Sequence, residues 1–179
     1  MNGRHACVVG LALLLSSALA EPAAAQEAGD KGVTVSAPSA IGLIWHLSSR
    51  WAIRPEFSFG LSESHGDGST LDISSHSASL AGSALFYVGQ WEKLQTYVSP
   101  RVSYSWAGSS IESGVDTSQN GWGVSGSFGA QYSLSDRFAV FAEAGLGYSS
   151  STSETSLTTL DRTSWAFGTR TQIGATLYF

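Results

Sequence analysis

Five residues that could take part in catalysis or metal binding are grouped in the first half of the chain: His65, Asp67, Asp72, His76 and Ser77. In a hydrolase, a base such as histidine activates a serine within hydrogen-bonding distance, and a third group orients the base. The spacing of the five residues enforces no such contact, and it matches no usual set of metal ligands. Ser, Gly and Asp are also common in hydrophilic turns. We therefore expect a polar loop here, with no catalytic, cofactor or metal site.

Five other charged residues are spread through segments that are otherwise apolar or small: Arg54, Glu56, Arg101, Glu143 and Arg170. Whether they meet depends on the elements that carry them. In these segments bulky apolar residues take every second position, and Ser, Gly or a charged residue mostly takes the positions between. A period of two is the pattern of β-strands with two unlike faces. The alternation is clean in five stretches: 51–62, 94–106, 122–134, 138–149 and 165–179.

All five charged residues fall on the face of small side chains. The interior of an eight-stranded barrel is only just wide enough to be filled by side chains, so Ser, Gly and a few charges fit there. A ring of Trp and Phe does not fit, and the bulky face must point outward to lipid. A soluble barrel with an apolar interior would have the opposite polarity. A helical membrane protein would need long apolar runs, which the strand-rich part of the chain lacks.

The sequence thus predicts an all-β fold, an antiparallel up-and-down transmembrane barrel of eight strands. Seven segments are evident: 40–47, 51–62, 73–89, 94–106, 121–134, 138–149 and 165–179. An odd number of strands would leave the first and last as parallel neighbours, so the barrel needs one more. We assign it to 30–36, which a tight link at 37–39 joins to the next segment.

The predicted connections alternate in length, as they do in outer-membrane barrels with short periplasmic turns and longer outer loops. Short links lie at 48–50, 90–93 and 136–137, and long polar links at 62–73, 107–121 and 150–164. The six Trp follow the same division. Those beside short links are Trp45, Trp51 and Trp91, and those beside long links are Trp106, Trp122 and Trp165. Two girdles of interfacial aromatic residues explain this division.

The first residues predict export. Arg4 precedes a short apolar run that ends in Ala18-Leu19-Ala20, as in a cleaved secretory signal peptide. We assign 1–20 to the signal, with cleavage as late as 25, then 21–30 to a flexible segment and 31–179 to the barrel. Cys7, the one cysteine, would leave with the signal, so the mature chain would hold no thiol or disulfide.

The last segment places apolar residues at alternate positions and ends on an aromatic one: Ile173, Ala175, Leu177 and Phe179. This pattern resembles the C-terminal assembly signal of bacterial outer-membrane barrels. With Trp-His-Leu at 45–47 and Arg-Trp-Ala-Ile-Arg-Pro-Glu at 50–56, it makes 31–179 similar to the small eight-stranded barrel family of OmpX-like, opacity-type and OmpA transmembrane-like domains. The resemblance implies the outer membrane of a Gram-negative bacterium, and the barrel assembly machinery as a partner of the last strand.

The inward charges admit two interpretations. Charges enclosed in a narrow barrel must be paired and hydrogen-bonded, which predicts a network that plugs the lumen; the alternative is a narrow channel. A lipid-modifying or proteolytic enzyme is a weaker alternative, because the sequence around the His-Asp-Ser group does not resemble lipid A deacylases or omptin proteases. We expect a monomer with a structural or surface-interaction role, in contact with outer-membrane lipids and lipopolysaccharide.

The predicted outer loops are acidic, with one cation among seven acids: Glu63, Asp67, Asp72, Glu112, Asp116, Glu154 and Asp161 against Arg162. The whole chain has a formal net charge of −5, and no basic stripe indicates a nucleic-acid partner. Acidic loops are commonly just a solvated face. They would also suit divalent cations around lipopolysaccharide or a basic surface on another molecule.

Overall fold

The computed structural model describes residues 28–38, 40–64, 73–111, 115–155 and 158–179. The predicted signal peptide and most of the predicted flexible segment lie outside these residues. Eight strands follow one another along the chain: β1 (Lys31–Ala37), β2 (Ala40–Ser48), β3 (Trp51–Ser64), β4 (Ile73–Trp91), β5 (Leu94–Ile111), β6 (Val115–Ser135), β7 (Phe138–Thr155) and β8 (Thr158–Tyr178). No helix in this part of the chain is long and apolar enough to cross a membrane.

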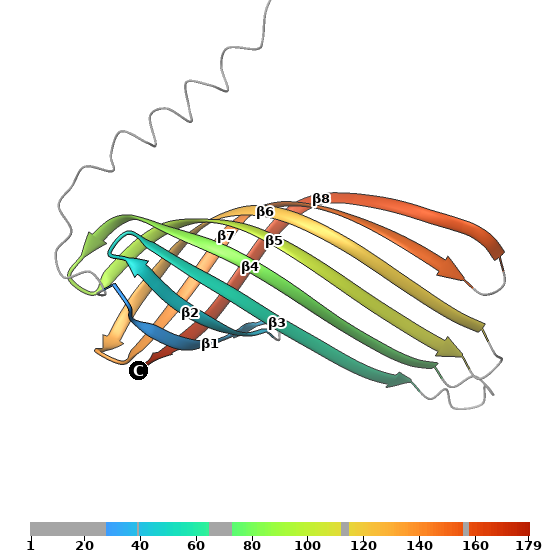
Figure 1. Ribbon diagram of the computed structural model, residues 1–179, viewed down its shortest axis with the longest axis horizontal. Coiled ribbons are helices and arrows are strands. Elements are labelled where there is room, and N and C mark those ends of the chain that lie inside the picture. The colour runs from blue at the N-terminus through green and yellow to red at the C-terminus, as the bar shows by residue number, and fades with distance from the viewer. Residues whose placement is uncertain (1–27, 39, 65–72, 112–114, 156–157) are drawn as a thin grey trace, which may run out of the picture.

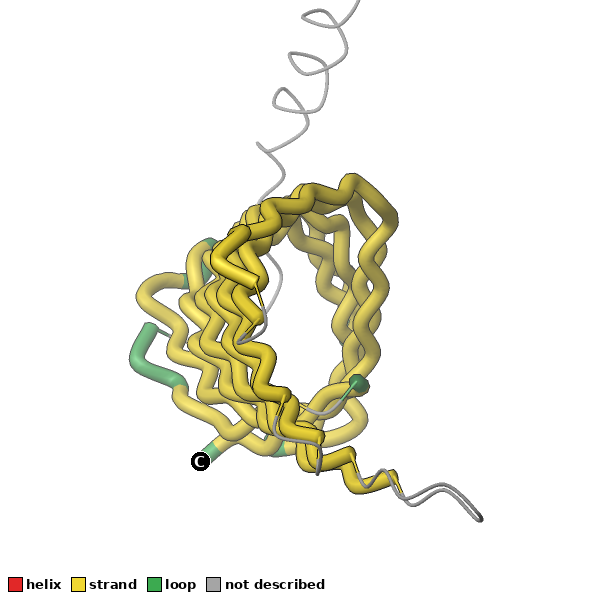
Figure 2. Tube along the Cα trace, turned by 90° about the vertical axis from the view of Figure 1, so that its right-hand side faces the viewer, coloured by secondary structure: helices red, strands yellow, loops and turns green. Residues whose placement is uncertain are grey.

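The eight strands form one closed barrel in which every neighbour is antiparallel (Figures 1 and 2). Closure depends on β1, whose residues pair with β2 on one side and with β8 on the other, from Gly32↔Tyr178 to Ala37↔Ile173. The prediction of an eighth strand at 30–36 is therefore confirmed, displaced by one residue.

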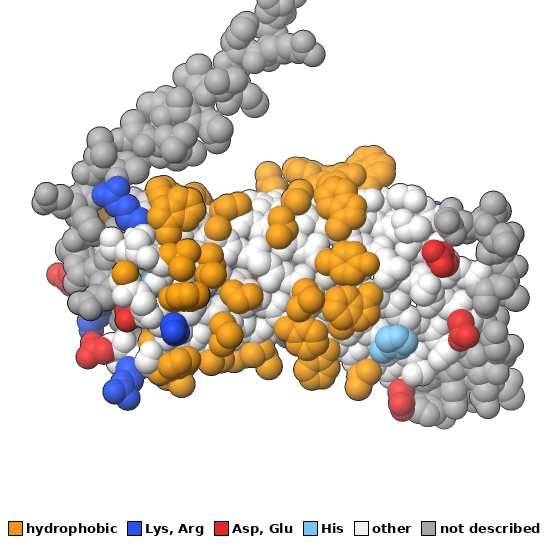
Figure 3. All heavy atoms as spheres, viewed as in Figure 1, with side chains coloured by type: hydrophobic (Ala, Val, Ile, Leu, Met, Phe, Trp, Pro, Cys, Tyr) orange, Lys and Arg blue, Asp and Glu red, His pale blue; other side chains and the backbone are white. Residues whose placement is uncertain are grey.

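Side chains alternate between the lumen and the outer surface along each strand, as the period of two requires. The outer positions are apolar and exposed, for example Leu61 at 81% and Trp165 at 73%. On the face seen in Figure 3 these side chains form a broad belt across the left and centre of the molecule, and most of the charged side chains lie toward its two ends. The inner positions of the same strands carry the buried polar and charged residues, among them Arg54, Glu56 and Glu143.

Two of the three predicted long links are wrong. Most of 107–121 and 150–164 is strand, because β5 and β6 continue to Ile111 and from Val115, while β7 and β8 continue to Thr155 and from Thr158. Side-chain hydrogen bonds cross these extensions, from Gln119 to Ser151 and between Ser151 and Ser164, both at 3.0 Å. The extensions carry polar residues on both faces, so the apolar alternation that reveals a half-buried strand is absent there.

The longer strands also change the placement of three Trp residues. Trp106 lies five residues before the end of β5, and Trp122 and Trp165 each lie seven residues after the start of their strands. These residues therefore mark the edge of the apolar belt rather than the strand ends. On the other side of the belt, Trp51 and Trp91 do stand at strand ends, beside the turns at 49–50 and 92–93.

The wall of the barrel is uneven in height. β1 and β2 contain 7 and 9 residues, whereas β3–β8 contain 14 to 21, and Figure 1 shows the two short strands ending well before the others. β2 pairs with β3 only as far as Ile41↔Phe57, and β1 pairs with β8 only as far as Ala37↔Ile173. Among the described residues no strand pairs with the facing edges of β3 after residue 57 and of β8 before residue 173. We call this opening the lateral gap.

Removal of 171–179 deletes every β8 residue that pairs with β1, so it opens the barrel along two edges. Unsatisfied backbone groups facing lipid cost several kcal/mol each, and we expect this variant not to fold. Removal of Phe179 alone deletes one backbone hydrogen bond, from its N–H to the carbonyl of Lys31 at 3.0 Å, and the barrel should still form. Heat-modifiable migration on cold gels separates the two results. A protease-resistant, heat-modifiable species from the nine-residue deletion would contradict the closed barrel.

Candidate functional site

The lumen is filled by apolar and aromatic side chains at the end that carries the short turns at 49–50, 92–93 and 136–137. The buried cluster consists of Ile44, Ala52, Leu85, Tyr97, Ala139 and Tyr178, with Tyr87 packed against it. His46 is 1% exposed and stacks on Tyr87, with 5.5 Å between ring centroids. Tyr178 accepts a hydrogen bond from Gln131 Nε2 at 3.0 Å. These side chains pack against one another across this end of the lumen.

Aromatic rings inside the barrel were not expected from sequence, and glycines make room for them. Tyr97 pairs across the sheet with Gly129, and Phe141 pairs with Gly174. A Cβ atom at either glycine would lie 2.5 or 2.6 Å from the partner's ring. Tyr178 likewise pairs with Gly32. Glycine within a strand often marks a close approach of another group. The inward-facing glycines were therefore a signal in the sequence that neighbouring strands place large side chains in the lumen.

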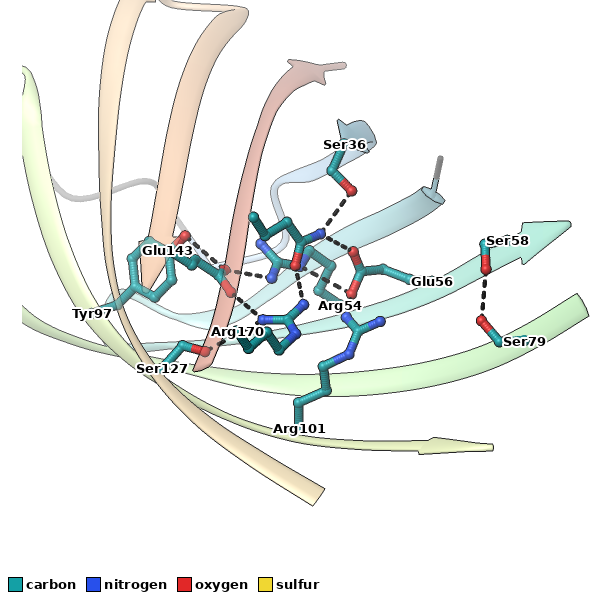
Figure 4. A network of polar contacts seen from close by, with 11 residues as sticks. Ser36, Arg54, Glu56, Ser58, Ser79, Tyr97, Arg101, Ser127, Glu143 and Arg170 are labelled. Carbon is teal, nitrogen blue, oxygen red and sulfur yellow. Dashed lines mark hydrogen bonds and ion pairs between the residues drawn. The ribbon is translucent and has the colours of Figure 1, made fainter. Parts of the chain in front are cut away.

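The five predicted lumen charges are brought together in one layer above the aromatic cluster (Figure 4). Glu143 of β7 stands at its centre. Its carboxylate accepts from Arg54 Nη2 at 2.5 Å, from Arg170 Nη1 at 3.2 Å and from the hydroxyl of Tyr97 at 3.0 Å. The guanidinium of Arg54 also lies 4.8 Å from the ring of Phe141, a cation–π contact.

Glu56 of β3 is the second acidic member of the layer. It forms ion pairs with Arg101 and with Arg54, whose Nε lies 3.8 Å from Glu56 Oε2. Gln172, which sequence reasoning did not select, links the two carboxylates: it donates to Glu56 at 2.6 Å and accepts from Arg170. Gln172 also donates to Ser36 Oγ at 2.7 Å, which connects the layer to β1. We use the name charged layer for seven residues: Arg54, Glu56, Tyr97, Arg101, Glu143, Arg170 and Gln172.

The structure describes only part of the His-Asp-Ser group in the first half of the chain. His65, Asp67 and Asp72 lie outside the described residues. His76 and Ser77 are neighbours in β4 and therefore point to opposite faces, His76 outward and Ser77 toward the lumen. They do not form a base–nucleophile pair with one another. Within the described ranges, no three residues of the His, Cys, Asp and Glu types are grouped to hold a metal ion.

The geometry defines a class of protein. An apolar outer belt, a polar interior and a backbone ladder that closes on itself are the properties of a β-barrel that spans a membrane. No protein-family model matches the sequence, and no curated protein matches it either.

The fold, unlike the sequence, is similar to that of known proteins. The chain is similar to a major outer membrane protein from Thermus thermophilus, with 11% sequence identity and a TM-score of 0.58, over 86% of this chain and 100% of that one. It is also similar to Ail, the attachment invasion locus protein of Yersinia pestis, with 13% identity and a TM-score of 0.50, again over 86% and 100%. The predicted fold, an all-β antiparallel barrel of eight strands, is confirmed.

The central position of Glu143 leads to a stability prediction. Glu143→Ala leaves Arg54 and Arg170 without their shared carboxylate, and removing one partner of a buried ion pair costs roughly 3–5 kcal/mol. Urea unfolding of the refolded barrel in lipid should show this loss. Glu154→Ala is the matched control, because Glu154 lies on the same strand and is exposed. Equal unfolding midpoints for the two variants would contradict a stabilising charged layer.

Proposed function

We propose that this chain is an integral outer-membrane protein of a Gram-negative bacterium, with a closed lumen and a structural or surface-interaction role. The observation that carries the proposal is the inverted distribution of polarity. Exposed Trp, Phe, Leu, Ile and Val form the outer belt, whereas Arg54, Glu56 and Glu143 are at most 4% exposed inside. This distribution suits lipid outside and a plugged lumen inside.

Two successive layers support a closed lumen. The aromatic cluster fills the short-turn end, and the charged layer crosses the lumen directly above it. An ion would have to displace Tyr97 and the Arg54–Glu143 pair to pass. These contacts favour the plug over the narrow channel, and no contact among the described residues favours catalysis.

A closed lumen predicts no ion current. The refolded protein, inserted into planar bilayers, should give no stepwise conductance above that of the bare membrane. Heat-modifiable migration of the same preparation is the control that the barrel is folded, and protease protection of the same vesicles shows that it is inserted. Conductance steps would contradict the closed lumen if Arg101→Gln changed their size, because the current would then pass through the inside of the barrel.

The long-strand end supports a surface role. Glu63, Asp116 and Glu154 lie on the strand extensions of β3, β6 and β7 and are exposed. Short turns are periplasmic in outer-membrane barrels, so we place this acidic end outside the cell. There it would contact lipopolysaccharide with its divalent cations, or a basic surface. Asp67, Asp72 and Glu112 lie outside the described residues, as does the side chain of Asp161.

This orientation can be tested because the predicted mature chain contains no cysteine. We expect Glu154→Cys to react with a membrane-impermeant maleimide on intact cells. Asp136→Cys, in the short turn between β6 and β7, is the matched control and should react only after the outer membrane is opened. Labelling of Asp136→Cys, but not of Glu154→Cys, on intact cells would mean that the barrel is inserted the other way.

The last strand supports the proposed partner. Ile173 and Leu177 face outward and are 63% and 56% exposed, and Phe179 follows them at 77%. A strand that closes the barrel while presenting this apolar stripe suits recognition by the barrel assembly machinery.

A further inference from the structure

The lumen is open on the long-strand side of the charged layer. A cavity of about 310 Å³ lies there, bounded by β5, β6, β7 and β8. Most of the residues that line it are small, among them Ser103, Ser125, Ser149 and Gly168, and two arginines, Arg101 and Arg170, also line it. Figure 4 shows Arg101 and Arg170 reaching into the lumen from their separate strands. The cavity therefore combines hydroxyl groups with two guanidinium groups.

The charges of this layer do not balance. Three arginines face two carboxylates. The side chains of Arg54, Glu56 and Glu143 are at most 1% exposed, whereas those of Arg101 and Arg170 are 14% and 22% exposed. Among the described residues, Arg101 has one ion-pair partner, Glu56, which Arg54 and Gln172 also contact. An enclosed positive charge without a counter-charge is costly, and arginine binds phosphate strongly through charge-assisted hydrogen bonds. An anion in the cavity would complete the layer.

The lateral gap and this cavity share the stretch of β8 that precedes residue 171. Arg170 lies on the stretch of β8 that β1 does not reach, three residues beyond the last pair at Ile173. The strand edges beside the gap carry apolar residues that face outward: Phe59 and Leu61 on β3, Trp165 and Phe167 on β8, with 63%, 81%, 73% and 66% exposure. The gap therefore opens at the level of the apolar belt, where lipid chains surround the protein.

We propose that the cavity binds one anionic lipid, with its phosphate group at Arg101 and Arg170 and its acyl chains passing through the lateral gap into the bilayer. The serine hydroxyls of the wall donate further hydrogen bonds to the phosphate or its ester oxygens. This inference rests on the proposed location in a membrane, and it adds a ligand to the closed barrel.

The test is native mass spectrometry of the refolded barrel, released from non-ionic detergent after incubation with dioctanoyl phosphatidic acid. We expect the wild type to retain one lipid, and Arg101→Gln to weaken the binding about tenfold or more. Arg101→Gln should fold, because Glu56 keeps Arg54 and Gln172 as partners. Arg137→Gln is the matched control: it removes the same charge from an exposed turn and should bind like the wild type. Ser125→Leu fills the cavity without changing its charge and should also lose the lipid.

Three other probes and measurements separate the outcomes. Dioctanoyl phosphatidylcholine, which has no net charge, and sn-glycerol 3-phosphate, which has no chains, should each bind at least about tenfold more weakly. Equal binding by glycerol phosphate would mean a site for soluble phosphate and would overturn the lipid. Equal lipid retention by Arg101→Gln or by Ser125→Leu would overturn the site. Heat-modifiable migration of each variant shows whether the barrel itself is formed, so a failed site is distinguished from a failed fold.

Discussion

The closure of the backbone ladder is the constraint on which this structure depends. A sheet with apolar residues on its outer face is stable only in lipid, and in lipid a free strand edge has no water to satisfy its N–H and C=O groups. The seven residues of β1 solve this problem at the short-turn side of the molecule, because they pair with β2 and β8 at once. All outward side chains, and all contacts across the lumen, require that these two ladders form.

Once the ladder is closed, polar contacts do inside the barrel what apolar packing does inside a soluble protein. Glu143 and Glu56 gather arginines from β3, β5 and β8, and Gln172 ties them to Ser36 on β1. A slip of one residue in any of these strands would turn its charged side chain out of the lumen. The charged layer thus specifies the register of strands whose outer faces, mostly apolar within the belt and in contact with fluid lipid, would tolerate several registers.

Sequence patterns predicted much of this arrangement and missed parts of it for physical reasons. The alternation around Arg54, Arg101 and Glu143 placed them on the inner face, because lipid on one side and a polar lumen on the other produce a strict period of two. The first strand was recoverable only from the need for an even number. The strand extensions around Gln119 and Ser151 were taken as loops, because water on both sides removes the alternation. The inward rings of Tyr97 and Phe141 were missed because their space comes from Gly129 and Gly174 on neighbouring strands, and that pairing depends on the register.

The strand extensions make the acidic end of the barrel an ordered surface. β6 and β8 continue for seven residues past Trp122 and Trp165, which is about 20 Å along each strand at the usual rise. Hydrogen bonds between side chains, from Gln119 to Ser151 and between Ser151 and Ser164, connect β6, β7 and β8 near the start of these extensions, and backbone pairing of β6 with β7 continues to Thr117↔Thr155. The acidic groups Asp116 and Glu154 are therefore presented on a ladder already fixed by hydrogen bonds. Because ordering a free loop costs roughly 1–2 kcal/mol per residue in backbone entropy, a partner that docks on this rim meets a surface whose ordering is complete before the encounter.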